Sequence, residues 1–488
     1  MLLLLTLIFA IIPLLVIYSW LKWEQEDAKM GISGPPTLPV LGNLVELWKS
    51  ARSFKEFEKF LEYTKTYGDT FRVRLGPKLM ICTRDVKIME QIANDPKFIK
   101  SHEYRFFKPW WGEGLVLSNG EKWMKFRKLL TPAFHFQILE RFLPIFHEQT
   151  DVLVEKLKNL EDEEAIDVTS YLHSFSLDVI AETAMGVKLN TQLNVQSKFV
   201  DYNAQVSHMI YKRIFNPFLA NDFIWKILGY ERRANHYIKY IQNYIIDIIT
   251  KRREILLSSD LSKRPKRSAF LDIMLLSDQQ ISNEEIRSET MVFMFAGHET
   301  TASTLGFFLY CVAKYQNVQK KLLEEIRKNE EEIKELTLQN INSYKYLDCV
   351  IRETLRMFPI SAFTPKMRTE DLKIGDIFIP KETTVMTLVL ASHMNEKYFE
   401  SPEKFIPERF DSEVDCASRN PYAYQPFSAG LRNCLGQRFA VLEMKVAAIK
   451  ILTEFEVSLG WESFRVDRIQ SNTMKSKNGI HLKFKKRF

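Results

Sequence analysis

Two segments of the chain are apolar almost without interruption, and each predicts a helix. Residues 1–21 carry no charged side chain, and residues 291–310, MVFMFAGHETTASTLGFFLY, are apolar except for a short polar insertion. The first segment is long enough to cross a hydrocarbon core of about 30 Å. The second predicts a helix that is buried on most of its surface and runs through the core of a domain.

The N-terminal segment predicts a membrane anchor over residues 1–22. A cleavable signal peptide would have a basic start and a small-residue cleavage site, and this segment has neither. Lys22 and Lys29 follow the apolar run, while no basic residue precedes it. The positive-inside rule therefore places the main body of the protein in the cytosol.

A proline-rich hinge is expected over residues 23–45, because GISGPPTLPVLGN, Gly31 to Asn43, holds three prolines and three glycines. No Gly/Ser-rich or Pro-rich linker and no internal repeat follows it. Residues 46–488 are therefore expected to form one large domain, mainly helical with small β-sheets.

Composition supports a globular protein with a large core, since 46% of residues are hydrophobic and 26% are charged. The net charge of +7 is dispersed and does not indicate a nucleic-acid partner. The basic run Lys251 to Arg267 is interpreted as a solvated loop, with a sequence address or an acidic-lipid contact as the alternatives.

Five cysteines are few for this length, odd in number and without a CxxC pair. This pattern argues against a disulfide scaffold or a zinc site and favours a reducing compartment. One of them, Cys434, lies in PFSAGLRNCLGQRFA, Pro426 to Ala440. On its own it could be a packed core residue, a nucleophile or a metal ligand.

Polar residues interrupt the second apolar segment at Gly297, His298, Glu299, Thr300 and Thr301. Such residues are costly in a buried helix unless they face a cavity or find partners. A threonine hydroxyl can bond the carbonyl one turn earlier and bend the helix, and the small pair Ala296 and Gly297 leaves room for a ligand. A kinked core helix with self-satisfied hydroxyls is the alternative.

A third pattern is RETLRMFP, in which Glu353 and Arg356 share one face of a helix and can pair. Downstream, PEKFIPERF offers Arg409 as a further member of a buried network.

Taken in order, the proline-rich hinge, AGHETT, ExxR, PERF and FSAGLRNCLG closely resemble the cytochrome P-450 haem-thiolate monooxygenases over essentially the whole chain. The last motif matches the family pattern Phe-x-x-Gly-x-Arg-x-Cys-x-Gly at Phe427, Gly430, Arg432, Cys434 and Gly436. The resemblance implies that Cys434 is the thiolate ligand of a haem iron and that Arg432 reaches a haem propionate. The glycines would let the loop wrap close to the sulfur.

The same resemblance assigns roles to the other motifs. Trp123 and Arg127 match the family's WxxxR helix and would be further propionate partners. Thr300 matches the threonine that stabilises bound dioxygen and helps to deliver protons, and Glu299 matches the adjacent acid that supplies them. The family also has a structural network that maintains the fold and retains the haem, and it is matched by Glu353, Arg356 and Arg409.

Within the family, RKLLTPAFHF, PYAYQPFSAG and FMFAGHETTAS look like the family-4 clan, whose best-known members hydroxylate fatty acids and related lipids at or near the terminal methyl. Many of them carry a glutamate, esterified to the haem, where this chain has Ala296. The resemblance therefore implies haem b without a covalent link. Several aromatic-rich parts of this chain are candidates for lining an apolar substrate pocket. They are the segments that start at Glu103, Pro359 and Ser471, together with Phe293 and Phe295.

The resemblance also implies partners and a location. Electrons would come from NADPH through NADPH-cytochrome P-450 reductase, with cytochrome b5 as a further donor, docking on a basic face near Arg432, Arg438 and Lys445. The catalytic domain would face the cytosol from the endoplasmic reticulum membrane. A haem-thiolate isomerase or peroxide-using enzyme, and a non-enzymatic haem-binding protein, remain as alternatives. No motif separates endogenous lipids from foreign apolar compounds as substrates.

Overall fold

Most of the chain is helical, and its strands form small sheets, as expected of a single mainly α domain. The computed structural model describes residues 2–160, 164–193, 197–258, 269–328, 336–411 and 419–487; of residues 2–12 and 217 it describes the backbone only. The basic run at 251–267 and Cys416 lie partly or wholly outside these ranges.

The α-helices, in chain order, are α1 (Leu2–Ala28), α2 (Leu44–Arg52), α3 (Glu56–Tyr67), α4 (Val86–Asn94), α5 (Lys108–Trp111), α6 (Gly120–Leu130), α7 (Phe136–Glu140), α8 (Leu143–Lys158), α9 (Thr169–Ile180), α10 (Lys198–Phe215), α11 (Pro217–Ala220), α12 (Asp222–Ile227), α13 (Tyr230–Leu257), α14 (Phe270–Leu275), α15 (Asn283–Lys314), α16 (Gln316–Lys328), α18 (Lys345–Met357), α19 (Val389–His393) and α20 (Gln437–Glu454). Shorter helical turns are η1 (His102–Phe107), η2 (Thr131–Phe134), η3 (Ala181–Met185), η5 (Asn340–Asn342), η6 (Pro407–Phe410), η7 (Pro421–Ala423) and η8 (Gly430–Arg432). The strands are β1 (Thr70–Leu75), β2 (Lys78–Thr83), β3 (Phe98–Lys100), β4 (Ile166–Asp167), β5 (Phe363–Arg368), β6 (Leu372–Ile374), β7 (Ile377–Ile379), β8 (Thr384–Leu388), β9 (Phe455–Leu459), β10 (Arg468–Gln470), β11 (Met474–Ser476) and β12 (His481–Lys486).

Helix α15 is the central element, and it contains the whole apolar segment 291–310. It begins at a capping box, in which Ser282 Oγ accepts a hydrogen bond from the Glu285 N–H and the Glu285 carboxylate accepts one from the Ser282 N–H. Helices α9, α13, α18 and α20 pack around it. Because neighbours surround α15, its apolar side chains are buried on nearly all sides.

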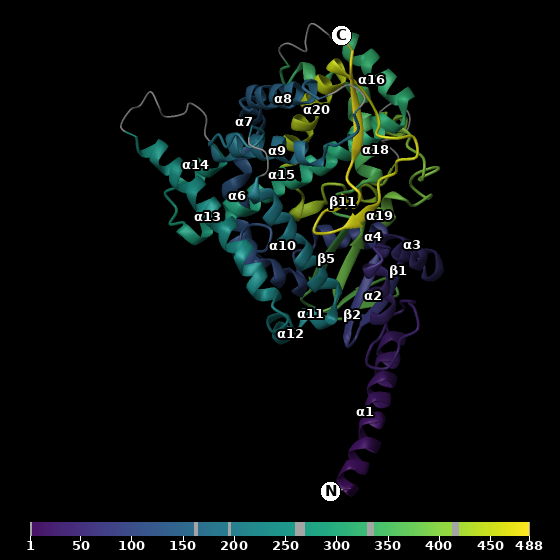
Figure 1. Ribbon diagram of the computed structural model, residues 1–488. Coiled ribbons are helices and arrows are strands. Elements are labelled where there is room, and N and C mark those ends of the chain that lie inside the picture. Colours follow the sequence, from purple (N-terminus) through teal and green to yellow (C-terminus); the bar gives the residue numbers. More distant parts are fainter. Residues whose placement is uncertain are drawn as a thin grey trace.

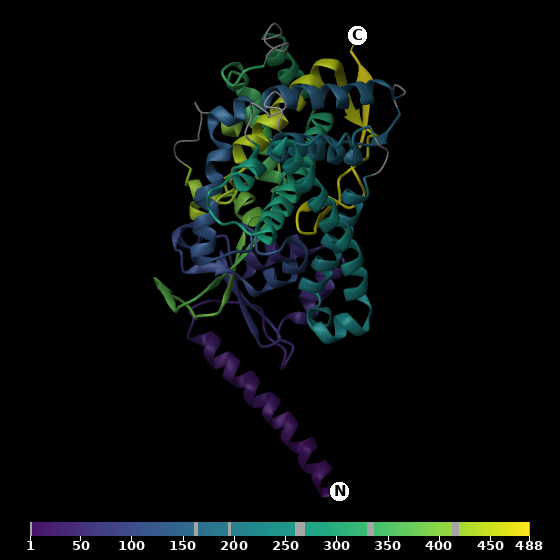
Figure 2. The ribbon, with the colours of Figure 1, turned by 90° about the vertical axis from the view of Figure 1, so that its left-hand side faces the viewer.

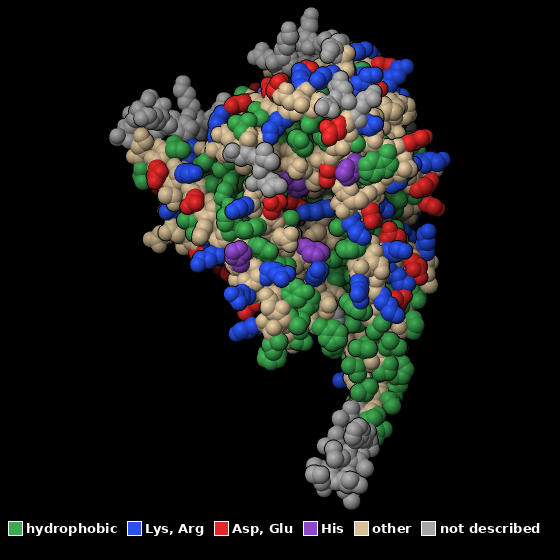
Figure 3. All heavy atoms as spheres, in the orientation of Figure 1, with side chains coloured by type: hydrophobic (Ala, Val, Ile, Leu, Met, Phe, Trp, Pro, Cys, Tyr) green, Lys and Arg blue, Asp and Glu red, His purple; other side chains and the backbone are tan. Residues whose placement is uncertain are grey.

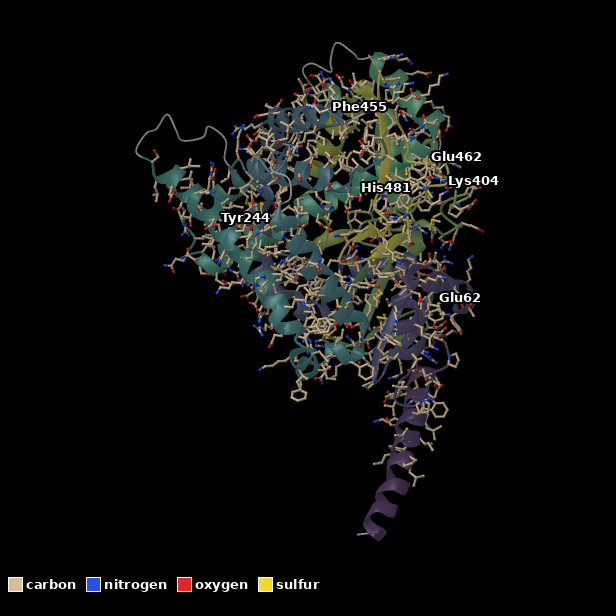
Figure 4. All side chains as sticks on the ribbon, in the orientation of Figure 1. Glu62, Tyr244, Lys404, Phe455, Glu462 and His481 are labelled. Atoms are coloured by element: carbon tan, nitrogen blue, oxygen red, sulfur yellow. The ribbon has the colours of Figure 1, made fainter. Side chains whose placement is uncertain are left out.

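The largest sheet has the strand order β1-β2-β8-β5-β3, in which β2 and β8 are parallel and the other pairs antiparallel. Its central strands bury Ile81, Cys82, Val385 and Leu388. A second sheet, β4-β12-β9, lies near the C-terminus, where Figure 4 marks Phe455 and His481. Figure 4 also marks Tyr244 on α13 and Glu62 on α3, on opposite flanks of the domain.

Helix α1 leaves the body as one long rod, at the end opposite the C-terminus (Figures 1 and 2). Its last turn is fixed to strand β1, because the buried Asp27 carboxylate accepts hydrogen bonds from Arg74 Nη2 at 2.7 Å and Nε at 3.1 Å. Thr37 Oγ1 in turn accepts from the Trp20 indole at 3.0 Å and donates to Glu24 at 2.7 Å. The described part of residues 23–45 is therefore held against the domain by specific contacts.

The expected anchor, residues 1–22, falls largely on positions whose side chains lie outside the described residues. Among the residues that are described, no helix has both the length and the apolar character required to cross a membrane.

Candidate active site

A cavity of about 910 Å³ brings the sequence motifs together. Its wall includes Cys434 from the loop before α20, Thr300 from α15, Trp123 from α6 and Arg432 from η8. The aromatic-rich segments expected to line a pocket also reach it, since Phe293, Phe295 and the stretches around residues 103–107, 360–364 and 471–473 are on the wall. Most of the lining is apolar, which suits an apolar ligand.

The loop of Cys434 is shaped by its own backbone. The Cys434 N–H donates to the Phe427 carbonyl at 2.9 Å, and Ser428 and Gly430 both have positive φ angles, of 60° and 66°. A Cβ on Gly430 would lie 2.2 Å from the Ala93 carbonyl oxygen, so both the φ angle and the close approach require glycine there. Gly436 has an ordinary φ of −87°, and a Cβ there would meet only Phe134, at 3.9 Å.

Cys434 differs from the other described cysteines, because Cys82, Cys311 and Cys349 are buried and Cys434 is exposed on the cavity wall. Its surroundings inside the protein raise the pKa of the thiol by desolvation, while the Gly436 N–H and the charge of Arg127 act in the opposite direction. The Cys434 thiol is therefore less acidic than an ordinary thiol, and a bound metal cation would favour its thiolate form.

Arg127 and Trp123 hold the cysteine loop in place from α6. Arg127 Nη1 donates to the Asn433 carbonyl at 2.8 Å, and its Nη2 donates to Asn433 Oδ1 at 2.5 Å. The Arg432 guanidinium stacks over the Trp123 ring, 4.1 Å from its centroid, and donates to the Ser118 carbonyl at 2.8 Å. Because Trp123 and Arg127 are one turn apart on α6, both side chains can contact the cysteine loop.

Lys100, which no sequence motif indicated, lies on this wall with the arginines, and Lys366 lies opposite it on the neighbouring strand β5. Burial and the nearby charges of Arg432 and Lys366 lower the pKa of Lys100 to about 7. Burial and Arg432 lower that of Lys366 to about 8, and burial and Arg127 lower that of Arg432 to about 10. Crowded cations of this kind, in a low-dielectric site, fit an anionic ligand with two carboxylates. This cluster and the open sulfur of Cys434 together fit a haem with its propionates.

Thr300 and Ala296 stand on the wall formed by α15. The Thr300 hydroxyl donates to the Ala296 carbonyl one turn earlier at 2.6 Å, and Thr304 repeats the pattern by donating to the Thr300 carbonyl at 2.8 Å. Because these hydroxyls still have free lone pairs, each can accept a hydrogen bond from a molecule in the cavity.

Glu299 is placed differently from the expectation of a ready proton donor beside Thr300. It is 2% exposed, and Lys475 Nζ lies 2.5 Å from its Oε1. Burial alone would raise the pKa of Glu299, but the charge and hydrogen bond of Lys475 outweigh it and hold the pKa far below its usual range. The carboxyl group is therefore ionised at neutral pH.

The histidines near Glu299 are neutral, because burial lowers the pKa of His173 to about 4 and also lowers that of His298. His173 Nδ1 lies 3.7 Å from Glu299 Oε2, and His298 Nε2 lies 3.8 Å from it. These three residues could supply metal ligands by spacing alone. The ammonium of Lys475 already provides the cation that this carboxylate needs, so the cluster is an ion pair with two neutral neighbours.

The structure brings Glu353, Arg356 and Arg409 together in the interior. Glu353 accepts from Arg356 Nε at 2.7 Å and Nη2 at 2.8 Å, and from Arg409 Nε at 3.1 Å. Arg356 also donates to the His393 carbonyl at 3.0 Å, which ties α18 to α19. The network joins the helix that carries ExxR to the turn that carries PERF.

The expected docking face near Arg432, Arg438 and Lys445 is not a continuous surface. Lys445 is 2% exposed and pairs with Asp348 at 2.8 Å, so the placement of Lys445 on that face was wrong. Arg432 is half-buried, and only Arg438 of the three is exposed. Lys445 follows Arg438 by two helical turns and shares its face of α20. That part of the face is covered by η5 and α18, because Lys445 Nζ also donates to the Ile341 carbonyl at 3.1 Å.

Comparison with known proteins supports the resemblance. The family model described as cytochrome P-450 matches residues 32–484. Cytochrome P-450 4V2 of Mus musculus is 34% identical, covering 99% of this chain and 94% of the relative. Cytochrome P-450 4d2 of Drosophila melanogaster is 34% identical, covering 98% of this chain and 99% of the relative. The human 4V2 protein is also 34% identical, over 96% of this chain and 91% of the relative.

Proposed function

The chain belongs to the cytochrome P-450 family and is a monooxygenase of that family, and on this basis we propose that Cys434 binds the iron of a haem b and that the enzyme inserts one oxygen atom from O₂ into an apolar substrate. The observation that carries the proposal is the exposed sulfur of Cys434 on an apolar cavity that also holds a cluster of crowded cations. When bound, the haem supplies iron for oxygen activation, and an anionic sulfur ligand favours cleavage of the O–O bond.

Haem retention is assigned to residues around the cysteine loop. Arg432 and Lys100 would pair with the propionates, and Trp123 would keep Arg432 in position by stacking. Arg127 fixes the loop through Asn433, and Gly430 allows the close approach to Ala93. Phe427 and Gly436 line the cavity on either side of Cys434 in the chain.

Proton delivery is assigned to α15. The Thr300 hydroxyl can accept a hydrogen bond at the cavity wall while it still donates to the Ala296 carbonyl. To donate into the cavity it must turn and break its bond to Ala296. Glu299 delivers a proton only after its contact with Lys475 opens, because the ion pair keeps its carboxyl group ionised. Lys475 is in this account a positioning residue that controls when Glu299 can be protonated.

Haem attachment is non-covalent in this proposal. Ala296 faces the cavity from α15 with a methyl side chain, which cannot form an ester with a haem. Apolar substrates, either fatty acids and related lipids or foreign compounds, are the proposed substrates, since most of the wall is apolar.

Electrons are proposed to come from NADPH through a flavoprotein reductase, with cytochrome b5 as a further donor. Exposed Lys125 and Lys128 on α6, together with Arg438, offer a basic surface near the cysteine loop, because Arg127 of the same helix contacts Asn433. Such a surface attracts an acidic partner at low salt.

A membrane-facing end is proposed where α1 leaves the body. Hydrophobic side chains gather at that end in Figure 3. Exposed apolar residues of the segment after α1 and of α11 and α12 belong to it: Leu38, Val40, Leu41, Phe218, Phe223 and Ile227. We place this end on the endoplasmic reticulum membrane, with residues 1–22 as anchor, 23–45 as hinge and the 46–488 domain in the cytosol.

Reconstituted turnover tests the proposal. Purified protein is supplied with reductase and NADPH and offered saturated fatty acids, alkanes and bulky apolar compounds, and product positions are read by mass spectrometry. Hydroxylated products that require NADPH, and that are lost in Cys434→Ala, are expected. Haem binding with no product from any substrate class would contradict the monooxygenase proposal.

A further inference from the structure

A polar cluster interrupts the apolar wall of the cavity between α3, α10 and the β10–β11 turn. Glu56 Oε1 accepts hydrogen bonds from the Tyr211 hydroxyl at 2.9 Å and from the Gln470 N–H at 3.3 Å. Asn472 Nδ2 donates to Ser207 Oγ at 2.8 Å, one turn from Tyr211 on α10. Glu56, Tyr211, Gln470 and Asn472 all line the cavity.

Three acceptor oxygens of this cluster have no hydrogen-bond partner among the described residues, although each is buried. They are Glu56 Oε2, Gln470 Oε1 and Asn472 Oδ1. The residues that carry the first two are 2% and 6% exposed. Native proteins rarely leave such groups unpaired, because the desolvation cost of a buried acceptor is then not offset. Three of them on one cavity wall indicate a ligand that donates hydrogen bonds.

The charges around the cluster disfavour a carboxylate ligand. In the described part of the chain Glu56 forms no ion pair, and burial raises its pKa. Lys78, which also lines the cavity, pairs with Glu103, and Lys100 and Arg432 belong to the cationic cluster near Cys434. A ligand carboxylate placed beside Glu56 would bring further acceptors to oxygens that need donors. If Glu56 is ionised, the ligand would also bring a like charge.

A hydroxyl group fits these oxygens better than an ammonium group does. It donates a hydrogen bond while carrying no charge, so it enters an apolar cavity at a smaller desolvation cost.

We propose that Glu56, Gln470 and Asn472, the acceptor cluster, bind the hydroxyl head group of an aliphatic substrate, so that the enzyme prefers long-chain alcohols over fatty-acid carboxylates. This inference rests on the proposed function, because it names the substrate class of the same cavity. Glu56 and its two neighbours are specificity-determining residues, distinct from the groups near Cys434.

Calorimetric titration of the haem-loaded, full-length protein tests the inference with three probes of equal chain length: dodecanol, its methyl ether and dodecanoate. The ether keeps the oxygen acceptor of the alcohol and replaces the hydroxyl hydrogen, the donor, by a methyl group. Dodecanol is expected to bind about tenfold more tightly than the ether, the factor that one hydrogen bond to a buried acceptor contributes. Dodecanoate is expected to bind more weakly than the alcohol. Equal affinity for alcohol and ether, or tighter binding of dodecanoate, would overturn the inference.

Glu56→Gln is the decisive variant, because it keeps an acceptor for Tyr211 and places an N–H donor where Oε2 now lies. The preference for alcohol over ether is expected to fall at least severalfold, and the affinity for dodecanoate to rise. Glu58→Gln, on the exposed side of α3, is the matched control and should leave the ratios unchanged. An unaltered preference in Glu56→Gln would overturn the assignment. The wild-type probe series remains decisive if the variant does not fold.

The two proposals fail in different ways. Turnover that favours dodecanoate would leave the monooxygenase proposal intact and refute the acceptor cluster. Donor-selective binding with no NADPH-dependent product would support the cluster and refute the proposed function.

Discussion

Replacing Glu353 by glutamine should destabilise the domain more than any single surface change. Glu353 and Arg356 are both fully buried, and the carboxylate accepts two hydrogen bonds from Arg356 and one each from Arg409 and the Ile406 N–H. Glutamine has nearly the same shape but no charge. The variant therefore leaves two guanidinium groups in the interior without a counter-charge.

Removing one partner of a buried ion pair costs about 3–5 kcal/mol, because the remaining charge keeps its desolvation penalty and loses its compensation. We expect a loss of that size in the free energy of unfolding of Glu353→Gln. Haem occupancy should fall with it, since the network joins α18 to the turn that precedes the cysteine loop.

The assay is equilibrium urea unfolding followed by circular dichroism, with Glu408→Gln as the control. Glu408 also pairs with a cation, Lys321 at 2.6 Å, but both side chains are about half exposed. That pair is worth about 0.2–1 kcal/mol, so the control variant should stay close to wild type. Equal, small losses in both variants would refute the argument that burial makes the Glu353 network important.

Three further predictions follow from the site. Thr300→Ala should retain haem while diverting reducing equivalents to peroxide, measured as NADPH consumed per product formed; unchanged coupling would remove Thr300 from oxygen activation. Haem-free protein should bind a dicarboxylate porphyrin more weakly as the pH rises above about 7. The reason is that Lys100 of the free protein then loses its proton, and the bound porphyrin carboxylates need Lys100 in its protonated form. Fluorescence titrations should show a flatter pH dependence for Lys100→Met or for a porphyrin diester. Acid-solvent extraction should release all haem from the polypeptide, and haem that stays attached would contradict the consequence drawn from Ala296.

The sequence predicted well those features that depend on local patterns. Helix α15, the cysteine loop and the pairing of Glu353 with Arg356 each arise from residues within a few turns of one another, so spacing alone indicates them. The fold class also follows from the motif order. For each of these features the local sequence pattern and the family motif predict the same structure.

Contacts between distant segments could not be predicted in the same way. Lys475 on β11 pairs with Glu299 on α15, and no local signal couples a strand residue to a helix so far away in the chain. Lys445 was expected on a surface because it follows the cysteine loop, but helix packing turns it toward Asp348. Glu56 at the start of α3 resembles an ordinary helix-terminal acid until Tyr211 and Gln470 enclose it.

Turnover under dioxygen labelled with the heavy oxygen isotope tests the central claim most directly. The protein is reconstituted with reductase and NADPH and given an apolar substrate that it hydroxylates. Each product molecule is expected to carry one labelled oxygen atom, and Cys434→Ala is expected to form no such product. Product oxygen derived from water or peroxide, or labelled product from Cys434→Ala, would contradict a monooxygenase that acts through the sulfur of Cys434.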